Sequence, residues 1–366
     1  MKILLLGEYS SLHNNLAHGL RQLGCEVCLV SGGDYWKDLD SDIKIRRKGY
    51  DLVSSLIYMT KILLNLPRFR GYDVVQIINP CFFDITVEKC WWIYKYLRRH
   101  NKKVFLGGFG VDHFWVKACL NDKTFRYSDF FVDGVARDNE YNRQEIKDWI
   151  GSPKEEINKK MADDCNGIIT GLYEYWAAYR PYYANKMTYI PMPIKEDLIA
   201  DKGIVGPIDK LRFFIGIQKE RSQVKGTDIV EPILNKVVEK YSDLSEVERV
   251  ESVPYEQYKE MLSNSHVLID QIYSYTPAMN ALLGMAKGLV VVSGGESEHY
   301  ALHRENENFP IINVLPTQED IYETLEMLVL NKNKIPKLSQ QSIDYVKKYH
   351  QSKDVASLYL DFWAKH

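Results

Sequence analysis

Short apolar runs alternate with longer segments of helical spacing along most of this chain. Residues 2–7 form an apolar run that stops at a glycine, and leucines then recur at helical spacing over residues 12–23. Further strands are expected at 26–30, 73–78, 103–106, 168–169 and 189–192, and further helices at 52–66 and 87–99. Because strands that alternate with helices form parallel sheets covered by helices, this half predicts an α/β, doubly wound domain.

A second alternation of the same kind follows. Its strands are expected at 212–217, 247–253, 267–270, 289–292 and 311–314. Residues 191–209, between the two alternations, are rich in proline, glycine and charge, which is typical of a linker. The last part of the chain predicts two helices with no strand left to pair, and we expect them to cross back to the first domain. The predicted domains are therefore 1–195 and 196–345, with a bracing helix at 346–366.

The stretch 263–298 predicts a strand, a loop, a helix, a second strand and a glycine turn. Thr276 is expected to cap a helix whose first residue is Pro277, and Gly288 is expected to end it in the left-handed conformation. A helix that begins at the carboxyl end of a strand presents free N–H groups, which suits a diphosphate. This stretch therefore predicts half of a nucleotide site.

The glycine pair Gly294 and Gly295 follows the second of these strands. Without a Cβ atom, such a turn lets a ligand approach the main chain closely. An ordinary strand-helix-strand unit without a ligand is the alternative, because such units are common and two glycines are a weak signal.

Composition narrows the class of protein. The formal net charge of -2 argues against nucleic acid as a partner, and 45% hydrophobic residues suffice for two buried cores. The six cysteines include a C-x-x-C pair, Cys25 and Cys28, but residues three apart on a strand point to opposite faces. We therefore expect reduced thiols and a cytoplasmic protein. No apolar run is long enough for a membrane span.

Two stretches are typical of a protein that contacts the inner face of a membrane peripherally. Residues 91–103, WWIYKYLRRHNKK, mix aromatic rings with cations, and residues 52–70 end in PRFR. The alternative is that the cations complement the helix dipole and that the aromatic rings belong to the core.

Four segments resemble the retaining family-four (glycosyltransferase group 1) enzymes, which have the GT-B fold. They are MKILLLGEYSSLHNNLAHGLRQLGCEVCLV, GIQKERSQVKGTDIVEPI, VESVPYEQYKEMLSNSHVLIDQ and ALLGMAKGLVVVSGG. The resemblance covers nearly the whole chain. It implies two Rossmann-like domains that face a cleft, with the acceptor on the N-terminal side and a nucleotide-sugar on the C-terminal side.

Arg221 and Lys225 match the arginine and lysine-glycine pair of that family. A transfer that releases a diphosphate needs positive charge on the leaving group, and a guanidinium with an ammonium supplies it without a metal. The helix start at Thr276 would add backbone donors. The alternative for the two cations is a solvated charged loop.

Two glutamates of the family are missing here. Tyr275 and Leu283 stand at the matching positions, where the resemblance places one carboxylate near the sugar and one on the donor ribose. A leucine accepts no hydrogen bond, and leaving a ribose hydroxyl unpaired costs about 1–3 kcal/mol. The candidate replacements are Gln271, Asn280, Glu296 and Glu298.

The first domain offers two further polar groups. His13, Asn14 and Asn15 follow the first strand, where they would line the acceptor, touch the donor phosphate, or simply cap a helix. Asp112 and His113 follow a strand and three glycines, and we expect them to orient the transferred sugar as catalytic residues. The family's usual histidine is replaced by phenylalanine at 109.

A pair of histidines four residues apart, His299 and His303, has the spacing of a metal pair. No third ligand is near them in the sequence, so we expect two surface histidines and no metal.

The leading function is a retaining, hexosyltransferase-type glycosyltransferase in polysaccharide biosynthesis. It would move a sugar from a UDP- or GDP-sugar to a cell-surface polysaccharide or a lipid-linked glycan, with no other cofactor. One alternative is a GT-B-shaped binding or scaffolding protein that has lost catalysis, which Tyr275 and Leu283 motivate. Another is a sugar-nucleotide epimerase.

Overall fold

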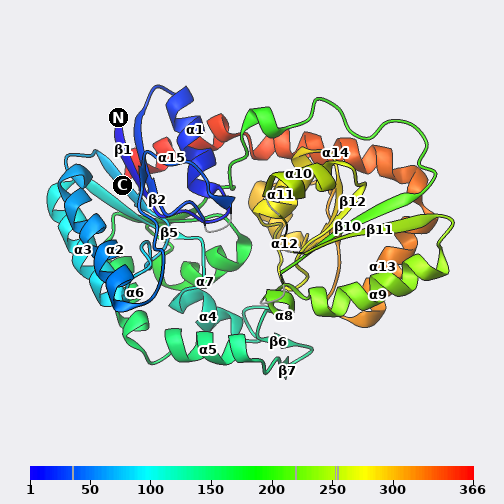
Figure 1. The fold of residues 1–366 in the computed structure, drawn as a ribbon, viewed down its shortest axis with the longest axis horizontal. Coiled ribbons are helices and arrows are strands. Elements are labelled where there is room, and N and C mark those ends of the chain that lie inside the picture. Colours follow the sequence, from blue (N-terminus) through cyan, green and yellow to red (C-terminus); the bar gives the residue numbers. More distant parts are fainter. Residues whose placement is uncertain (35–36, 219–220, 252, 254) are drawn as a thin grey trace.

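The chain forms two α/β lobes that lie side by side (Figure 1). The computed structural model describes residues 1–34, 37–218, 221–251, 253 and 255–366. The first lobe holds a seven-stranded parallel sheet in the order β3-β2-β1-β4-β5-β8-β9. Its strands are β1 (Lys2–Leu6), β2 (Glu26–Ser31), β3 (Ile43–Lys44), β4 (Val74–Ile77), β5 (Lys103–Gly108), β8 (Gly167–Thr170) and β9 (Met187–Tyr189).

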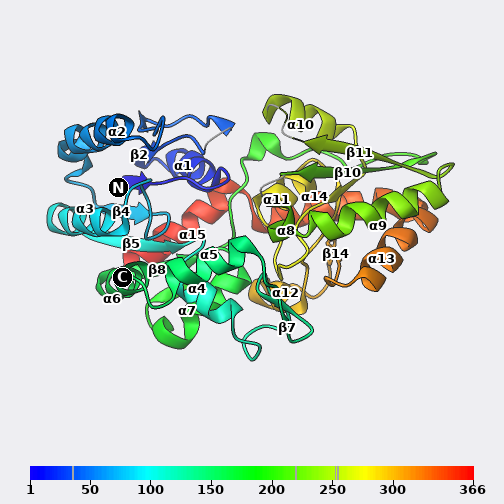
Figure 2. The ribbon, with the colours of Figure 1, turned by 60° about the horizontal axis from the view of Figure 1, so that its bottom comes forward.

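Helices cover both faces of the first sheet, and several begin at a polar cap. They are α1 (Leu12–Gln22), α2 (Leu52–Asn65), η2 (Leu66–Phe69), α3 (Val87–His100), α4 (His113–Cys119), α5 (Glu140–Trp149), α6 (Pro153–Asp164) and α7 (Tyr173–Tyr183). Asp51, Asn139 and Ser152 each accept a hydrogen bond from the first turn of the helix they precede. A small hairpin of β6 (Phe131–Val132) and β7 (Val135–Ala136) extends toward the second lobe (Figure 2).

The second lobe repeats the plan with a five-stranded parallel sheet in the order β11-β10-β12-β13-β14. Its strands are β10 (Leu211–Ile217), β11 (Ser245–Glu251), β12 (Val267–Ile269), β13 (Val290–Ser293) and β14 (Ile312–Asn313). Its helices are α8 (Ser222–Lys225), α9 (Thr227–Lys240), α10 (Tyr255–Ser263), α11 (Met279–Ala286), α12 (Ser297–His303) and α13 (Gln318–Leu330). Short 3-10 turns lie at Glu196–Leu198 and Lys332–Lys334.

The last two helices tie the lobes together. Helix α14 (Ile335–Tyr349) packs against α11, and α15 (Ser352–Lys365) crosses to the first lobe, where it packs against α1 (Figure 1). The two backbones are so close that a Cβ atom on Gly19 would lie 2.0 Å from the Ser352 carbonyl oxygen. The indole of Trp363 is fully buried under the first sheet and donates to Gln76 Oε1 at 3.3 Å. This is the predicted return of the C-terminal helices.

The expected strands are confirmed in type and order, with shifted ends. The strand expected at 189–192 is β9, at Met187–Tyr189, and the one expected at 247–253 begins at Ser245. Residue 252 of that prediction, and residue 254 of the family's valine-proline pair, lie outside the described residues. Gly288 has a φ of +82°, as a left-handed helix end requires.

One helix start was predicted wrongly. Helix α11 begins at Met279 after Ala278, which provides no side-chain cap, so neither Thr276 nor Pro277 starts it. Thr276 instead accepts a hydrogen bond from the first-lobe Tyr173 N at 3.0 Å. A contact between the lobes therefore uses the residue that the sequence indicated as a cap.

Candidate functional site

Polar side chains meet at the carboxyl edge of the second sheet, next to the start of α11. Lys225 Nζ lies 3.7 Å from Asp270 Oδ1, and Asn280 Nδ2 donates to the same oxygen at 3.2 Å. Tyr258 OH donates to Asn280 Oδ1 at 2.8 Å. The structure thus brings together two predicted residues, Lys225 and Asn280, through Asp270, whose role the sequence analysis missed.

Asp270 is nearly fully buried, and its second oxygen, Oδ2, has no hydrogen-bond partner among the described residues. A buried carboxylate oxygen without a donor is costly, so such an atom marks a place where a ligand hydroxyl or a water can bind. The signal in the sequence was its position directly after a buried strand, where ligands bind in α/β sheets.

Arg221 precedes α8 and is exposed, and its charge acts on the carboxyl of Asp129 in the first lobe. Burial raises the pKa of Asp129 to about 7, and the charges of Arg137 and Arg221 oppose that rise. Arg221 and Lys225 stand at opposite ends of the short helix α8. Whether they bind a diphosphate stays a prediction.

The glycine turn serves close packing of the protein itself. A Cβ atom on Gly294 would lie 1.8 Å from the Ser274 carbonyl oxygen, and one on Gly295 would lie 2.7 Å from Ile311 Cγ2. Asn313 Oδ1 accepts from Gly295 N at 2.8 Å. Protein atoms therefore fill the space that the sequence analysis reserved for a ligand.

Glu296 was a candidate replacement for the missing ribose ligand, but its carboxylate is engaged. Oε1 accepts from Tyr127 OH at 2.8 Å and Asn313 Nδ2 at 3.1 Å, and Oε2 accepts from Arg126 at 2.8 Å. Glu298 also pairs with Arg126. Both glutamates hold a first-lobe arginine. Asn280 is also hydrogen-bonded, to Tyr258 and Asp270, but it lies beside the unpartnered Asp270 oxygen and its amide has a second N–H to donate, so it is the better placed candidate. Gln271 accepts a hydrogen bond from Ser293 through its backbone carbonyl.

Tyr275 fills the position where the resemblance places a carboxylate. Its side chain is buried, and its hydroxyl accepts from the backbone N–H groups of Arg126 and Tyr127 at 2.6 and 3.3 Å. Its ring stacks on Tyr127 with centroids 4.8 Å apart. Leu283 is also buried, on α11. The second lobe therefore inserts an aromatic ring into the first lobe at this position.

A carboxylate does reach this place, from the other lobe. Glu174, in the first turn of α7, accepts hydrogen bonds through Oε1 from the backbone N–H groups of Tyr275 and Thr276. Its Oε2 is buried without a partner among the described residues, and burial raises the pKa of the carboxyl. Glu174 was not among the residues predicted from the sequence, although it follows strand β8 by only four residues.

The two predicted catalytic residues are buried inside the first lobe. Asp112 caps α4 by accepting from Trp115 N at 2.9 Å, and its other oxygen accepts from Tyr179 OH at 2.7 Å. Burial raises its pKa to about 6. His113 Nδ1 lies 2.9 Å from the Trp149 carbonyl oxygen. These contacts hold three helices together, so the structure gives both residues a packing role and no open face for a sugar.

The loop after β1 is organised by a residue that was not singled out. Glu8 accepts from the N–H groups of His13 and Asn14 at 3.3 and 2.7 Å, so a side-chain carboxyl group of the protein occupies the N-terminus of α1. His13 is buried, with Nδ1 2.8 Å from the Gly7 carbonyl oxygen. Asn15 donates to the Pro193 carbonyl oxygen at 2.8 Å. Asn14 donates to Asp40 O and is the more accessible of the three.

The expectation that His299 and His303 lie on the surface is wrong. His299 is fully buried with Nε2 2.8 Å from Tyr345 OH, and His303 Nε2 lies 2.9 Å from Tyr189 OH. His350 joins them, with rings of His303 and His350 5.6 Å apart. This histidine cluster lies where β9, α12 and the C-terminal helices meet. Across the described residues, no group of three or more metal-ligating side chains has the arrangement of a metal site.

All six cysteines are free thiols. Within the part of the chain that the structure describes, no helix is both long enough and apolar enough to cross a membrane.

Two parallel sheets with helices on both faces, joined by C-terminal helices that return to the first lobe, define the GT-B fold. Solved structures with that fold confirm it. Sucrose-phosphate synthase from Thermosynechococcus elongatus matches over 100% of both chains with a TM-score of 0.61 and 13% identity. Anabaena HepE in complex with UDP and glucose matches over 100% of both chains with a TM-score of 0.59 and 9% identity.

An enzyme of another activity has a similar structure. UDP-GlcNAc 2-epimerase from Neisseria meningitidis bound to UDP-GlcNAc covers 100% of both chains with a TM-score of 0.54 and 11% identity. Neither a protein-family model nor a curated protein sequence matches this chain. At these identities the likeness establishes the fold and leaves the chemistry to the residues of this chain.

Proposed function

We propose that this protein is a retaining glycosyltransferase that uses a UDP- or GDP-sugar. The observation that carries the proposal is the cluster of Lys225, Asp270 and Asn280 beside the start of α11. It places an ammonium group, an amide and a carboxylate with a free oxygen at the carboxyl edge of the second sheet. Nucleotides bind at this edge in α/β folds.

In this proposal each part of the donor has a distinct partner. Arg221, Lys225 and the N-terminus of α11 stabilise the charge that develops on the diphosphate when the sugar bond breaks. Asn280, with Asp270 behind it, binds a ribose hydroxyl in place of the missing glutamate. The acceptor is a glycan or a lipid-linked glycan that reaches the site from the first lobe at the cytoplasmic face of a membrane.

A thermal-shift screen against UDP, GDP, ADP, CMP and their sugar conjugates tests the donor site. A ligand at one hundred times its dissociation constant stabilises the protein by about 2.7 kcal/mol, which raises the midpoint measurably. We expect a shift with one nucleotide that disappears in Arg221→Ala/Lys225→Ala. The matched control is Lys236→Ala/Lys337→Ala, which removes two exposed cations elsewhere and should keep the shift.

A sugar-nucleotide epimerase is the second candidate, because UDP-GlcNAc 2-epimerases are among the similar structures. Product analysis separates the two. The transferase releases nucleoside diphosphate by slow donor hydrolysis even without an acceptor, whereas an epimerase converts the sugar and keeps it on the nucleotide. Binding without either product would favour a scaffolding protein, and no shift with any nucleotide would reject the donor site.

A further inference from the structure

Helix α2 turns its apolar side outward. Of its residues, only Tyr58 and Ile62 are buried. Six aliphatic side chains are exposed, namely Leu52 (86%), Val53 (65%), Leu56 (67%), Ile57 (52%), Leu63 (43%) and Leu64 (74%). They form two rows along the helix, 52/56/63 and 53/57/64, with spacings of four and then seven residues, so they share one half of the helix surface. We call this surface the α2 face.

An apolar surface of this extent needs a partner. Single exposed leucines are ordinary, but contiguous apolar patches on a protein surface mark sites of interaction. Asp51 caps the helix by accepting from Ser54 N at 3.0 Å, so the helix is formed in the free protein with its apolar face already presented.

Cations lie at the C-terminal end of the α2 face. Lys61 is exposed on the helix, and Arg68 and Arg70 follow it on and just after η2. Tyr96 joins this turn to α3, because its hydroxyl donates to the Leu66 carbonyl oxygen at 3.1 Å and contacts Arg70. The two helices lie next to each other at the end of the molecule farthest from the second lobe (Figures 1 and 2).

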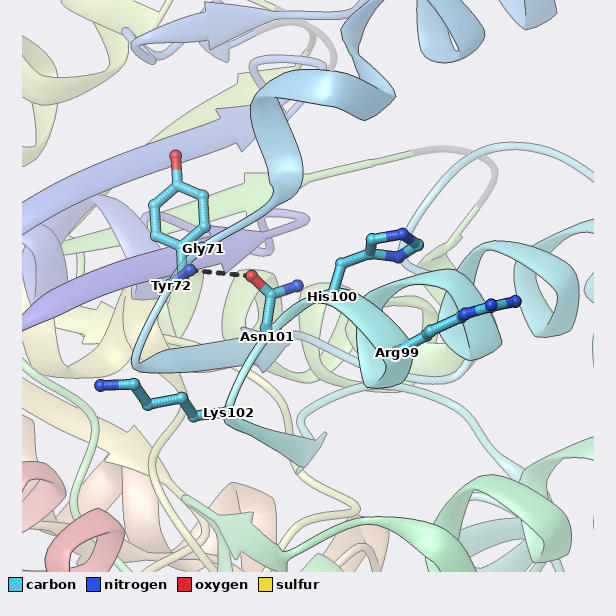
Figure 3. Close-up of a pocket in the computed structure, with 6 residues that line it drawn as sticks. All are labelled: Gly71, Tyr72, Arg99, His100, Asn101 and Lys102. Atoms are coloured by element: carbon cyan, nitrogen blue, oxygen red, sulfur yellow. Dashed lines mark hydrogen bonds between the residues drawn. The ribbon is translucent and has the colours of Figure 1, made fainter.

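Two shallow hollows lie along α3, and the first of them also borders the residues that follow η2. One is lined by Gly71, Tyr72, Arg99, His100, Asn101 and Lys102 (Figure 3), and the other by Trp91, Lys95, Arg98, Arg99 and Asp164. Arg99 lines both, and within the described residues its guanidinium makes no ion pair. Gly71 N donates to the His100 carbonyl oxygen at 3.0 Å, which fixes this corner next to η2. A phosphate group would find an unpaired guanidinium here.

We propose that the α2 face docks on an anionic membrane surface. The aliphatic side chains enter the headgroup region, while Arg68, Arg70 and Arg99 bind lipid phosphates. Trp92, half exposed on α3, stacks on Tyr96, the residue that joins α3 to η2. This surface is separate from the proposed donor site, and its docking does not depend on the transfer reaction.

Charge favours a membrane over a second copy of the chain. Residues 48–103 hold ten Lys or Arg and four Asp or Glu, whereas the whole chain has a formal net charge of -2. Two copies joined through the α2 face would place these cations against each other, which is unfavourable. An anionic lipid surface complements both the charge and the apolar face.

Co-sedimentation of the full chain with vesicles tests the proposal. One set contains phosphatidylcholine alone and the other equal parts of phosphatidylcholine and phosphatidylglycerol. We expect binding to the anionic vesicles that weakens with added salt. Leu56→Ser/Ile57→Ser/Leu64→Ser and, separately, Arg68→Gln/Arg70→Gln/Arg99→Gln should each weaken that binding at least tenfold.

The matched control is Val205→Ser/Leu330→Ser/Leu358→Ser, which removes three aliphatic side chains that are equally exposed elsewhere and should bind like the parent. Unchanged midpoints of thermal unfolding show that each variant is folded. The proposal is overturned if the parent does not bind anionic vesicles. It is also overturned if the Leu56→Ser/Ile57→Ser/Leu64→Ser variant, the α2 variant, binds them as well as the control. Sedimentation velocity tests the other occupant. If the parent is a dimer that does not bind vesicles, and only the α2 variant is a monomer, the face belongs to an interface with a second copy.

Discussion

The Tyr275 hydroxyl lies 2.6 Å from the backbone nitrogen of Arg126, across the boundary between the two lobes. The same arginine places its guanidinium 5.0 Å from the centre of the Tyr275 ring and pairs with Glu296 and Glu298. The residue that replaces an expected glutamate is thus part of a bond between the lobes. Glu296 and Glu298, two of the candidate replacements for the missing ribose ligand, are therefore engaged in this contact between the lobes.

Tyr275→Phe should destabilise the protein. The change removes the only oxygen that accepts from the N–H groups of Arg126 and Tyr127 in the described structure, and buried donors without a partner cost about 1–3 kcal/mol. Urea unfolding measures the loss. Tyr182→Phe is the control, because Tyr182 is half exposed, and its effect should stay within about 0.5 kcal/mol. Equal effects of the two changes would contradict the role of the hydroxyl.

Tyr275→Glu restores the family's residue type, and we expect it to lower stability rather than rescue a site. The new carboxylate would be buried beside Glu174, with Glu296 and Glu298 close by, and like charges there repel. The midpoint of thermal unfolding should fall at pH 7 and fall less at pH 5, because burial raises the pKa of Glu174 and would raise that of the new carboxyl, so that both take up protons more readily there. A more stable variant, or one with raised donor hydrolysis, would show that the cavity accepts a carboxylate.

Asp270→Ala should weaken nucleotide binding at least tenfold. Asp270 holds both Lys225 and Asn280, so its loss frees the two side chains that the proposed donor site needs. Isothermal titration with the nucleotide found in the thermal-shift screen measures the change. Asp209→Ala removes a carboxylate from the linker and should leave the affinity unchanged. If the Asp270→Ala variant binds the nucleotide with the affinity of the parent, the nucleotide does not bind at this cluster.

Glu8 should make the protein less stable as the pH rises. Burial raises the pKa of its carboxyl from 4.5 to about 8, so the folded protein holds a proton that the unfolded chain releases. The stabilising contribution is complete below pH 4.5 and is lost as the pH rises to about 8. In Glu8→Gln, unfolding measured between pH 5 and 8 should depend less on pH. Equal slopes for the parent and the variant would mean that the carboxyl titrates normally.

The histidine cluster should act in the opposite direction. Burial lowers the pKa of His350 to about 4 and that of His303 to about 3, with the charge of His350 adding to the effect at His303. Below pH 6.5 the unfolded chain therefore binds protons that the folded chain does not bind. The free energy of unfolding falls as the pH drops toward 4. His350→Asn should reduce this slope, while His18→Asn on the surface should retain it.

The sequence predicted what depends on local patterns. Apolar runs marked the strands of both sheets except β3, the two-residue edge strand of the first sheet, and a glycine at 288 marked the end of α11. Pairings between distant segments leave no local mark, so the contacts of Tyr275 with residues 126–127 and of Glu174 with residues 275–276 were missed. Asp112 and His113 showed the same limit, because a polar pair after a glycine loop fits a catalytic site and a helix start equally well, and only burial separates them.

The crossing of α15 has a consequence for synthesis. Phe105, at the centre of the first sheet, packs against Phe362 and Trp363 with ring centroids 5.8 and 6.2 Å away. The first lobe leaves the ribosome before residues 352–366 are synthesised. Its core therefore stays incompletely buried until those residues are available to pack against it. Until then its central strands expose an apolar surface, which is when a chaperone would be most useful and a truncated chain most prone to aggregate.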